Sequence, residues 1–181
     1  MLLEDFTVND AVAIVSGDEQ ELLSSFWEYL QQHRTSRFVA HNGLAFDLPF
    51  IWNRCVINRV RPGFELDLRK FRKDFVFDTM AVWSNWDHRL SPKLGDLGEA
   101  LSLGSKLASG DEVLALWEAG KLSDLACYCL RDCWLTYGCY CRMHFAEPTP
   151  EAAVLCEQRI LGNEFGSRLQ TLQPVTVLAA R

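Results

Sequence analysis

Short apolar segments alternate along this chain with longer segments in which apolar residues recur every three or four positions. Residues 10–15 and 37–40 have the composition of short strands, and residues 19–30 between them have the periodicity of an amphipathic helix. Asp18 and Glu21 stand three residues apart at the start of that helix, which is the spacing of a capping box. Strands that alternate with helices form layered sandwiches, so we predict an α/β fold.

The rest of the chain continues this alternation. A helix from about Leu44 has Pro49 near its first turn, where a missing backbone N–H is tolerated. The longest helical pattern covers residues 123–145, and Pro148 and Pro150 end it. The further elements that we predict are short helices at about residues 94–103 and 111–119, a polar helix near 151–168, a strand or turn at about 75–80 and a strand at 174–180.

Length and charge narrow the class of protein. The 181 residues fit a single domain, and we see no internal repeat and no linker that divides it. No apolar run approaches the ~20 residues that span a bilayer, and no basic start followed by an apolar segment indicates secretion, so we expect a cytoplasmic protein without a membrane partner. The net charge of −6 argues against a protein that grips nucleic acid by bulk charge, so any such contact has to be local.

Basic residues gather in one segment of the chain. The first 33 residues contain no Lys or Arg, whereas residues 54–73 contain seven of the 18 basic residues. Two interpretations stay open, a solvated surface and a patch that faces phosphates. The basic cluster consists of Arg54, Arg59, Arg61, Arg69, Lys70, Arg72 and Lys73.

Cysteines gather in another segment. Five of the seven lie between residues 127 and 141, and His144 follows them. A zinc site is one interpretation, but neighbours at C-x-C spacing on one helix point in different directions. We favour buried thiols in a reducing cytosol, and the odd number of cysteines argues against a disulfide framework.

Two short motifs carry groups suited to chemistry. The first, His41 to Phe50, places the carboxylate of Asp47 at the start of a helix just after a strand. The second, Tyr128-Cys-Leu-Arg-Asp132, places a phenol and a carboxylate four residues apart, hence on one face of a helix. Each motif alone has a structural interpretation: Asp47 stabilising a helix N-terminus, Tyr128 packing in the core, and Asp132 lying on an exposed helix face.

Together and in this order, the two motifs resemble those of the DEDDy 3′–5′ exonucleases. The match is closest to the predicted exonucleases related to the proofreading domain of family B DNA polymerases. Asn42-x-x-x-Phe46-Asp47 resembles the second exonuclease motif, and Tyr128-x-x-x-Asp132 resembles the third. Residues 77–80, 94–106 and 110–121 resemble the segments between those motifs, so the resemblance covers about residues 10–145 and leaves 146–181 as a C-terminal extension.

This resemblance implies an RNase H-like fold, in which helices flank a mixed sheet, and two-metal hydrolysis of phosphodiesters from 3′ ends. Carboxylates are needed because Mg²⁺ or Mn²⁺ ions stabilise charge on both the attacking and the leaving oxygen. The implied partner is the 3′ end of single-stranded DNA or RNA. By resemblance, Asp132 is a direct metal ligand, Asp47 holds the second metal, Tyr128 orients the attacking water, Asn42 and Phe46 position the terminal nucleotide, and Lys106 meets a phosphate.

The sequence departs from the family at one motif. The family's first motif, Asp-x-Glu on the first strand, does not occur before Asn42. By resemblance, residues 10–40 follow two strands that are missing here, so the two-metal site is expected to be incomplete and activity low or absent. Loss of a central strand would leave two unpaired strand edges inside the fold. Residues 175–180 or a second copy of the chain are the occupants that we consider for the gap.

Three functional hypotheses follow. The first is a 3′–5′ exonuclease. The second is a catalytically impaired RNase H-like module that binds nucleic acid or a polymerase or repair partner. The third, a cysteine-based zinc module, is the least favoured.

Overall fold

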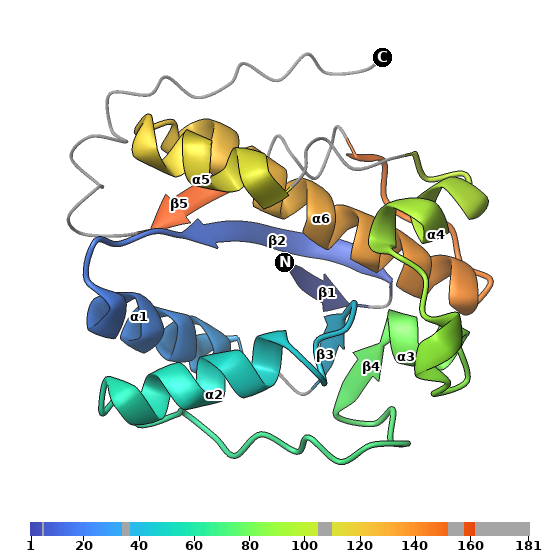
Figure 1. Cartoon of the computed structure of the whole chain (residues 1–181), viewed down its shortest axis with the longest axis horizontal. Coiled ribbons are helices and arrows are strands. Elements are labelled where there is room, and N and C mark those ends of the chain that lie inside the picture. Colours follow the sequence, from blue (N-terminus) through green and yellow to red (C-terminus); the bar gives the residue numbers. More distant parts are fainter. Residues whose placement is uncertain (5, 34–36, 105–109, 152–157, 162–181) are drawn as a thin grey trace.

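The computed structural model describes residues 1–4, 6–33, 37–104, 110–151 and 158–161. Figure 1 shows mixed α/β architecture, with helices on both sides of short strands. Among the described helices, none is long and apolar enough to cross a bilayer. The helices are α1 (Glu19–Gln32), α2 (Asp47–Ile57), α3 (Thr79–Trp83), α4 (Leu94–Ala100), α5 (Gly110–Glu118) and α6 (Leu122–Met143), with a 3₁₀ turn at His88–Leu90.

The first sheet has the order β1-β2-β5. Strand β1 (Leu2–Glu4) pairs antiparallel with β2 (Thr7–Ile14), and β5 (Gln158–Leu161) pairs parallel with β2, from Ala11↔Gln158 to Ile14↔Leu161. The strand predicted at residues 10–15 is confirmed by β2, and β1 before it was not predicted. The prediction of a polar helix near 151–168 is wrong at residues 158–161, which form a strand. Pairing with the edge of β2 satisfies backbone groups of both strands, which overrides local helical propensity.

The second sheet consists of β3 (Phe38–Ala40) and β4 (Val76–Asp78), which run parallel. Their last residues, Ala40 and Asp78, face each other in the register, so the segments that follow both strands start side by side. The strand predicted at residues 37–40 is confirmed, and the segment at 75–80 contains strand β4 followed directly by α3.

Within the described residues, no strand pairing joins the two sheets. Residues 175–180, which we considered as the missing strand, lie outside the described residues, and the structure holds one copy of the chain. What lies between the sheets is a cavity, described below.

The start of α1 shows how local sequence sets an element. The Asp18 carboxylate accepts hydrogen bonds from the backbone N–H groups of Gln20 and Glu21, at 2.7 and 3.2 Å. In a capping box the Glu21 side chain would accept from the backbone N–H of Asp18. Here Ser16 lies between them: the Asp18 N–H donates to Ser16 Oγ at 3.1 Å, and the Ser16 hydroxyl donates to Glu21 at 2.6 Å. The predicted helix start is thus confirmed, and Ser16 bridges Asp18 and Glu21.

Two apolar clusters lie on opposite sides of the molecule. One joins α1, α2 and β4, and the Trp27 indole N–H at its centre donates to Cys55 Sγ at 3.1 Å. The other joins β2, α4 and α6, with Leu135 fully buried. In Figure 1, α1 and α2 lie below the first sheet, and α5 and α6 lie above it.

Helix α6 is also fixed at its C-terminal half. The hydroxyl of Tyr137 donates to the Phe6 carbonyl at 2.6 Å, and the same oxygen accepts from the Thr149 N–H at 2.7 Å. Trp134 donates to the Thr149 carbonyl at 3.0 Å. The bond to Phe6 holds α6 against the β1–β2 turn, and the bonds to Thr149 hold the segment after α6 against the helix. Asp132 lies between one and two helical turns before Tyr137, so its position is fixed as well.

Candidate active site

A cavity of about 1260 Å³ lies between the two sheets. Its walls include Val12 and Ile14 of β2, residues 38–40 of β3, and parts of α1 and α6. Asp47, at the first position of α2, and Asp132, in the middle of α6, both line it. The two predicted carboxylates, far apart in the sequence, therefore meet at one cavity.

The loop between β3 and α2 is held in place by Asp78. One carboxylate oxygen of Asp78 accepts from the Asn42 N–H and the other from the Leu44 N–H, both at 3.0 Å. Asp78 is also the N-cap of α3 and accepts from the N–H groups of Met80 and Ala81, at 3.1 and 3.2 Å. Only 2% of Asp78 is exposed. This one buried carboxylate orients the loop that leads into Asp47.

The role of Asp78 was not predicted from the sequence. The sequence resemblance of residues 77–80 assigns no role to Asp78. The available signal was an aspartate directly before a helix start, which is typical of an N-cap. No sequence pattern, however, indicated that the same carboxylate also binds a loop that lies 34 residues earlier in the chain.

Two residues of the loop have the backbone that it requires. Asn42 adopts a left-handed conformation, with φ of 67°, which asparagine tolerates better than most residues. At Gly43 an added Cβ would lie 2.3 Å from the Cβ of Ala40, so the turn leaves no room for a side chain. The sequence Asn42-Gly43 is thus explained by the loop's geometry, and Asn42 also lines the cavity.

His41 links the loop to its surroundings. Its Nδ1 lies 2.9 Å from Thr79 Oγ1 and its Nε2 lies 3.1 Å from the Pro92 carbonyl. Thr79, which is fully buried, also donates to the Ala40 carbonyl at 3.1 Å. His41 therefore supports the end of β3 against α3 and the segment before α4.

The electrostatic environment of Asp47 favours its protonated form. Loss of solvent around the carboxyl raises its pKa above the usual 3.8, and the Asp78 carboxylate acts in the same direction. The backbone N–H of Asp47 and the side chain of His41 partly oppose this. Ionised Asp47 consequently costs folding stability.

We expect Asp47→Asn to raise stability at neutral pH. Because the folded-state pKa is raised, the cost is absent below about pH 3.8 and grows as the pH rises through the folded-state value. Asp47 is partly solvated, so the gain is small, on the order of 0.5 kcal/mol. Urea unfolding of both proteins at several pH values between 3 and 7 checks this; the gain should appear above about pH 3.8 and become constant once the pH exceeds the folded-state pKa.

Asp67→Asn is a control of opposite sign. The hydrogen bond with Arg69 lowers the pKa of Asp67 from the usual 3.8 to about 2. The ionised form of Asp67 therefore favours the folded state, fully so above about pH 3.8. The control should therefore show no gain at pH 7. Equal gains from both substitutions would contradict our account of Asp47.

The remaining predicted site residues occupy different places. Tyr128 lies one turn before Asp132 on α6, but among the described residues it is not one that lines the cavity. Phe46 is 62% exposed at the N-terminus of α2, beside Asp47. Lys106 lies outside the described residues. A basic residue that was not predicted, Lys93, lines the cavity together with the two carboxylates.

The side chains that line the cavity limit which metal site it can form. In the part of the chain that the structure describes, no group of three or more His, Cys, Asp or Glu side chains is placed to hold a metal ion. Asp47 and Asp132 alone do not make the two-metal cluster that the resemblance implies. Two carboxylates are, however, a set with which proteins bind one Mg²⁺ when water and substrate phosphates complete its shell.

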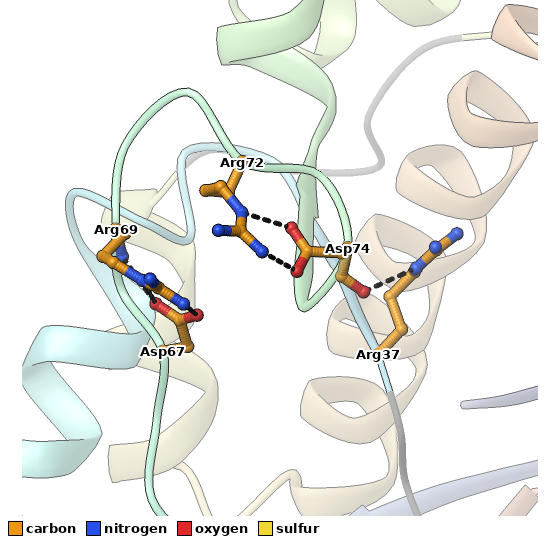
Figure 2. Close-up of polar contacts among 5 residues, drawn as sticks. All are labelled: Arg37, Asp67, Arg69, Arg72 and Asp74. Carbon is orange, nitrogen blue, oxygen red and sulfur yellow. Dashed lines mark hydrogen bonds and ion pairs between the residues drawn. The ribbon is translucent and has the colours of Figure 1, made fainter.

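The basic cluster is partly neutralised by acids within the same fold. Figure 2 shows Arg69 paired with Asp67, and Arg72 paired with Asp74 through Nε at 2.8 Å. These bonds hold the pKa of Asp67 and Asp74 at about 2. Arg54 forms an ion pair with Glu19.

The other arginines of the cluster face elsewhere. Arg59 and Arg61 line a separate cavity of about 890 Å³ against α1, which contains neither Asp47 nor Asp132. Of the two interpretations, a solvated surface fits Arg59 and Arg61 better than a patch that faces phosphates bound at the carboxylates.

The five cysteines of α6 differ in exposure, and Cys127 is intermediate. Cys139 and Cys141 are buried, as we expected of thiols in a core. Cys129 and Cys133 are exposed, so the prediction of buried thiols is wrong for these two. Their spacing of four residues places them on one helix face.

Comparison with known proteins gives one match. The model of the family described as "Predicted 3'-5' exonuclease related to the exonuclease domain of PolB" matches residues 3–158. No curated protein and no solved structure matches significantly. The matched range includes both motifs and the paired strands β2 and β5 up to residue 158.

Proposed function

The chain belongs to the family of predicted 3′–5′ exonucleases related to the exonuclease domain of PolB, and from this premise we propose that it acts on the 3′ end of single-stranded nucleic acid in the cavity between its sheets. One observation carries the proposal. Asp47 and Asp132, which come from the two family-like motifs, line the same cavity together with Asn42. Family membership supports hydrolysis of a phosphodiester as the reaction class.

The proposed roles follow the chemistry of that reaction. Phosphodiester hydrolysis needs a positioned water and stabilisation of charge on the attacking and leaving oxygens, which Mg²⁺ or Mn²⁺ supplies when bound. Asp47 and Asp132 would hold the cation. Asn42 would hydrogen-bond the terminal nucleotide, and Lys93 would pair with a phosphate. Tyr128 would orient the water only if its side chain turns toward the cavity.

A second candidate function rests on a specific observation. The described residues offer two carboxylates where a two-metal site needs more. A module that binds single-stranded 3′ ends without cleaving them, in association with a polymerase or repair partner, fits that donor set. Both candidates use the same cavity and differ only in hydrolysis.

The experiment incubates the full chain with a 5′-labelled single-stranded oligonucleotide and Mg²⁺ or Mn²⁺, and follows products on a sequencing gel. A ladder that shortens one nucleotide at a time from the 3′ end supports the exonuclease. The same oligonucleotide with a blocked 3′ terminus, and a reaction with EDTA, are the controls. Binding measured by anisotropy without any shortening favours the binding module, and neither binding nor shortening overturns both candidates.

A further inference from the structure

Helix α2 carries an apolar pair on the face that points away from the core. Leu48 and Cys55 are buried against α1, whereas Phe46 and Phe50 are 62% and 54% exposed. The two phenyl rings are nearly parallel, with an interplanar angle of 14° and centroids 6.1 Å apart. Two large aromatic rings are therefore exposed to solvent on one helix surface, although such rings are normally buried.

The position of this pair relates it to the cavity. Phe46 directly precedes Asp47, and Phe50 lies one helical turn further along α2, about 5.4 Å along the axis. The aromatic surface therefore begins beside a cavity-lining carboxylate and continues away from it. Neither ring lines the cavity itself, so a chain bound with its terminus at Asp47 would meet them where it leaves the cavity along α2.

Aromatic rings on such a path bind nucleobases. Every base has a π face, and stacking on a side chain contributes about 1–3 kcal/mol per base irrespective of sequence. In a duplex these faces are covered by neighbouring base pairs, so only an unpaired strand can use the rings. The aliphatic continuation of the same helix face, Ile57, lacks a π system although it is 64% exposed.

We propose that Phe50 forms a second stacking subsite, which binds the base next to the terminal one and makes the site selective for single-stranded ends. The inference rests on the proposed function and extends it by one nucleotide and one residue. Phe46 and Phe50 together then offer one aromatic ring each to two successive bases. Phe50 is a binding residue in this scheme and takes no part in hydrolysis.

The test measures binding of a 5′-labelled single-stranded oligonucleotide by anisotropy in EDTA, so that hydrolysis does not interfere. Phe50→Leu, which keeps an apolar side chain but removes the ring, should weaken binding about 5- to 50-fold, in line with stacking of one base. Phe50→Trp should restore wild-type affinity. Ile57→Ala, on the same exposed helix face, is the matched control and should leave affinity unchanged.

A second readout separates stacking from a structural effect. An oligonucleotide with 5-iodouracil at the position next to the 3′ end should crosslink to Phe50 under long-wavelength light, as located by mass spectrometry of the peptide. Wild-type affinity in Phe50→Leu, equal loss in Ile57→Ala, or absence of the crosslink would each overturn the subsite while the proposed function stands. If the wild-type chain binds no oligonucleotide, the subsite and the proposed function fall together.

Discussion

Asp132→Asn is expected to slow the release of nucleotides from a 3′ end by about a hundredfold or more, because substitution of a mere supporting residue around a metal ligand already costs 10- to 100-fold. Asp132 lies in the middle of α6, and its carboxylate lines the cavity with Asp47. An amide of the same shape has half the acceptor capacity and no charge to bind a cation. The expected result therefore follows from loss of charge at a fixed position.

The measurement compares initial rates of shortening of a 5′-labelled single strand by wild type and variant. Asp124→Asn is the matched control, because Asp124 is an exposed acid in the first turn of the same helix. It should leave the rate within about twofold, since a surface charge near a helix end contributes only about 0.3–1 kcal/mol to stability and touches no substrate. Both variants should unfold at nearly the wild-type urea concentration. Equal rates for Asp132→Asn and wild type would show that any hydrolysis occurs elsewhere.

Elements with a strong local signal were predictable from the sequence. The periodic apolar residues of α6 and the Asp18 cap of α1 act within one or two turns, so a short window of sequence contains their cause. Gly120, with a positive φ of 67°, follows α5 where we expected that helix to end, whereas α4 ends at Ala100, four residues before Gly104. Local chemistry alone fixes these features.

The elements that were missed depend on partners distant in the sequence. Strand β1 has three residues and is defined by pairing with β2, and β5 by its parallel pairing with the other edge of β2. A segment of three or four residues has no periodicity that distinguishes it from a loop. Such strands exist because backbone groups need partners in the folded state, which a local pattern does not record.

In the candidate site, too, locally encoded features were predictable from the sequence and those that depend on distant partners were not. The two motifs contain Asp47 and Asp132, which both line one cavity in the structure. Each motif is a local pattern: the first contains the start of α2, and the second is a single turn of α6. The sequence left two interpretations of the basic cluster open because it does not show that Arg69 and Arg72 pair with Asp67 and Asp74 of the same segment. Composition counted those arginines as free charge, whereas the fold neutralises them at close range.

Asp78→Ala is expected to destabilise the protein by about 3 kcal/mol, because hydrogen bonds to a charged group contribute about 1.5–3 kcal/mol each and a lost helix cap costs about 0.5–2 kcal/mol. Four backbone N–H groups, from two segments 34 residues or more apart, lose their acceptor at once. The site is buried, so water replaces the carboxylate poorly. The loop that carries Asn42 and leads to Asp47 should loosen together with the fold.

Urea unfolding monitored by far-UV circular dichroism measures the loss, with two variants that separate its parts. Asp87→Ala removes another capping aspartate, which is more exposed and whose backbone contact, Arg89 N–H at 3.0 Å, lies in its own turn, so it should cost about 1 kcal/mol or less. Asp78→Asn keeps one acceptor oxygen, and should lie between wild type and Asp78→Ala even if the alanine variant does not fold. Equal destabilisation by Asp78→Ala and Asp87→Ala would mean that Asp78 serves only as a cap for α3. A larger loss at Asp78 is the signature of a carboxylate that also holds the loop of the candidate active site.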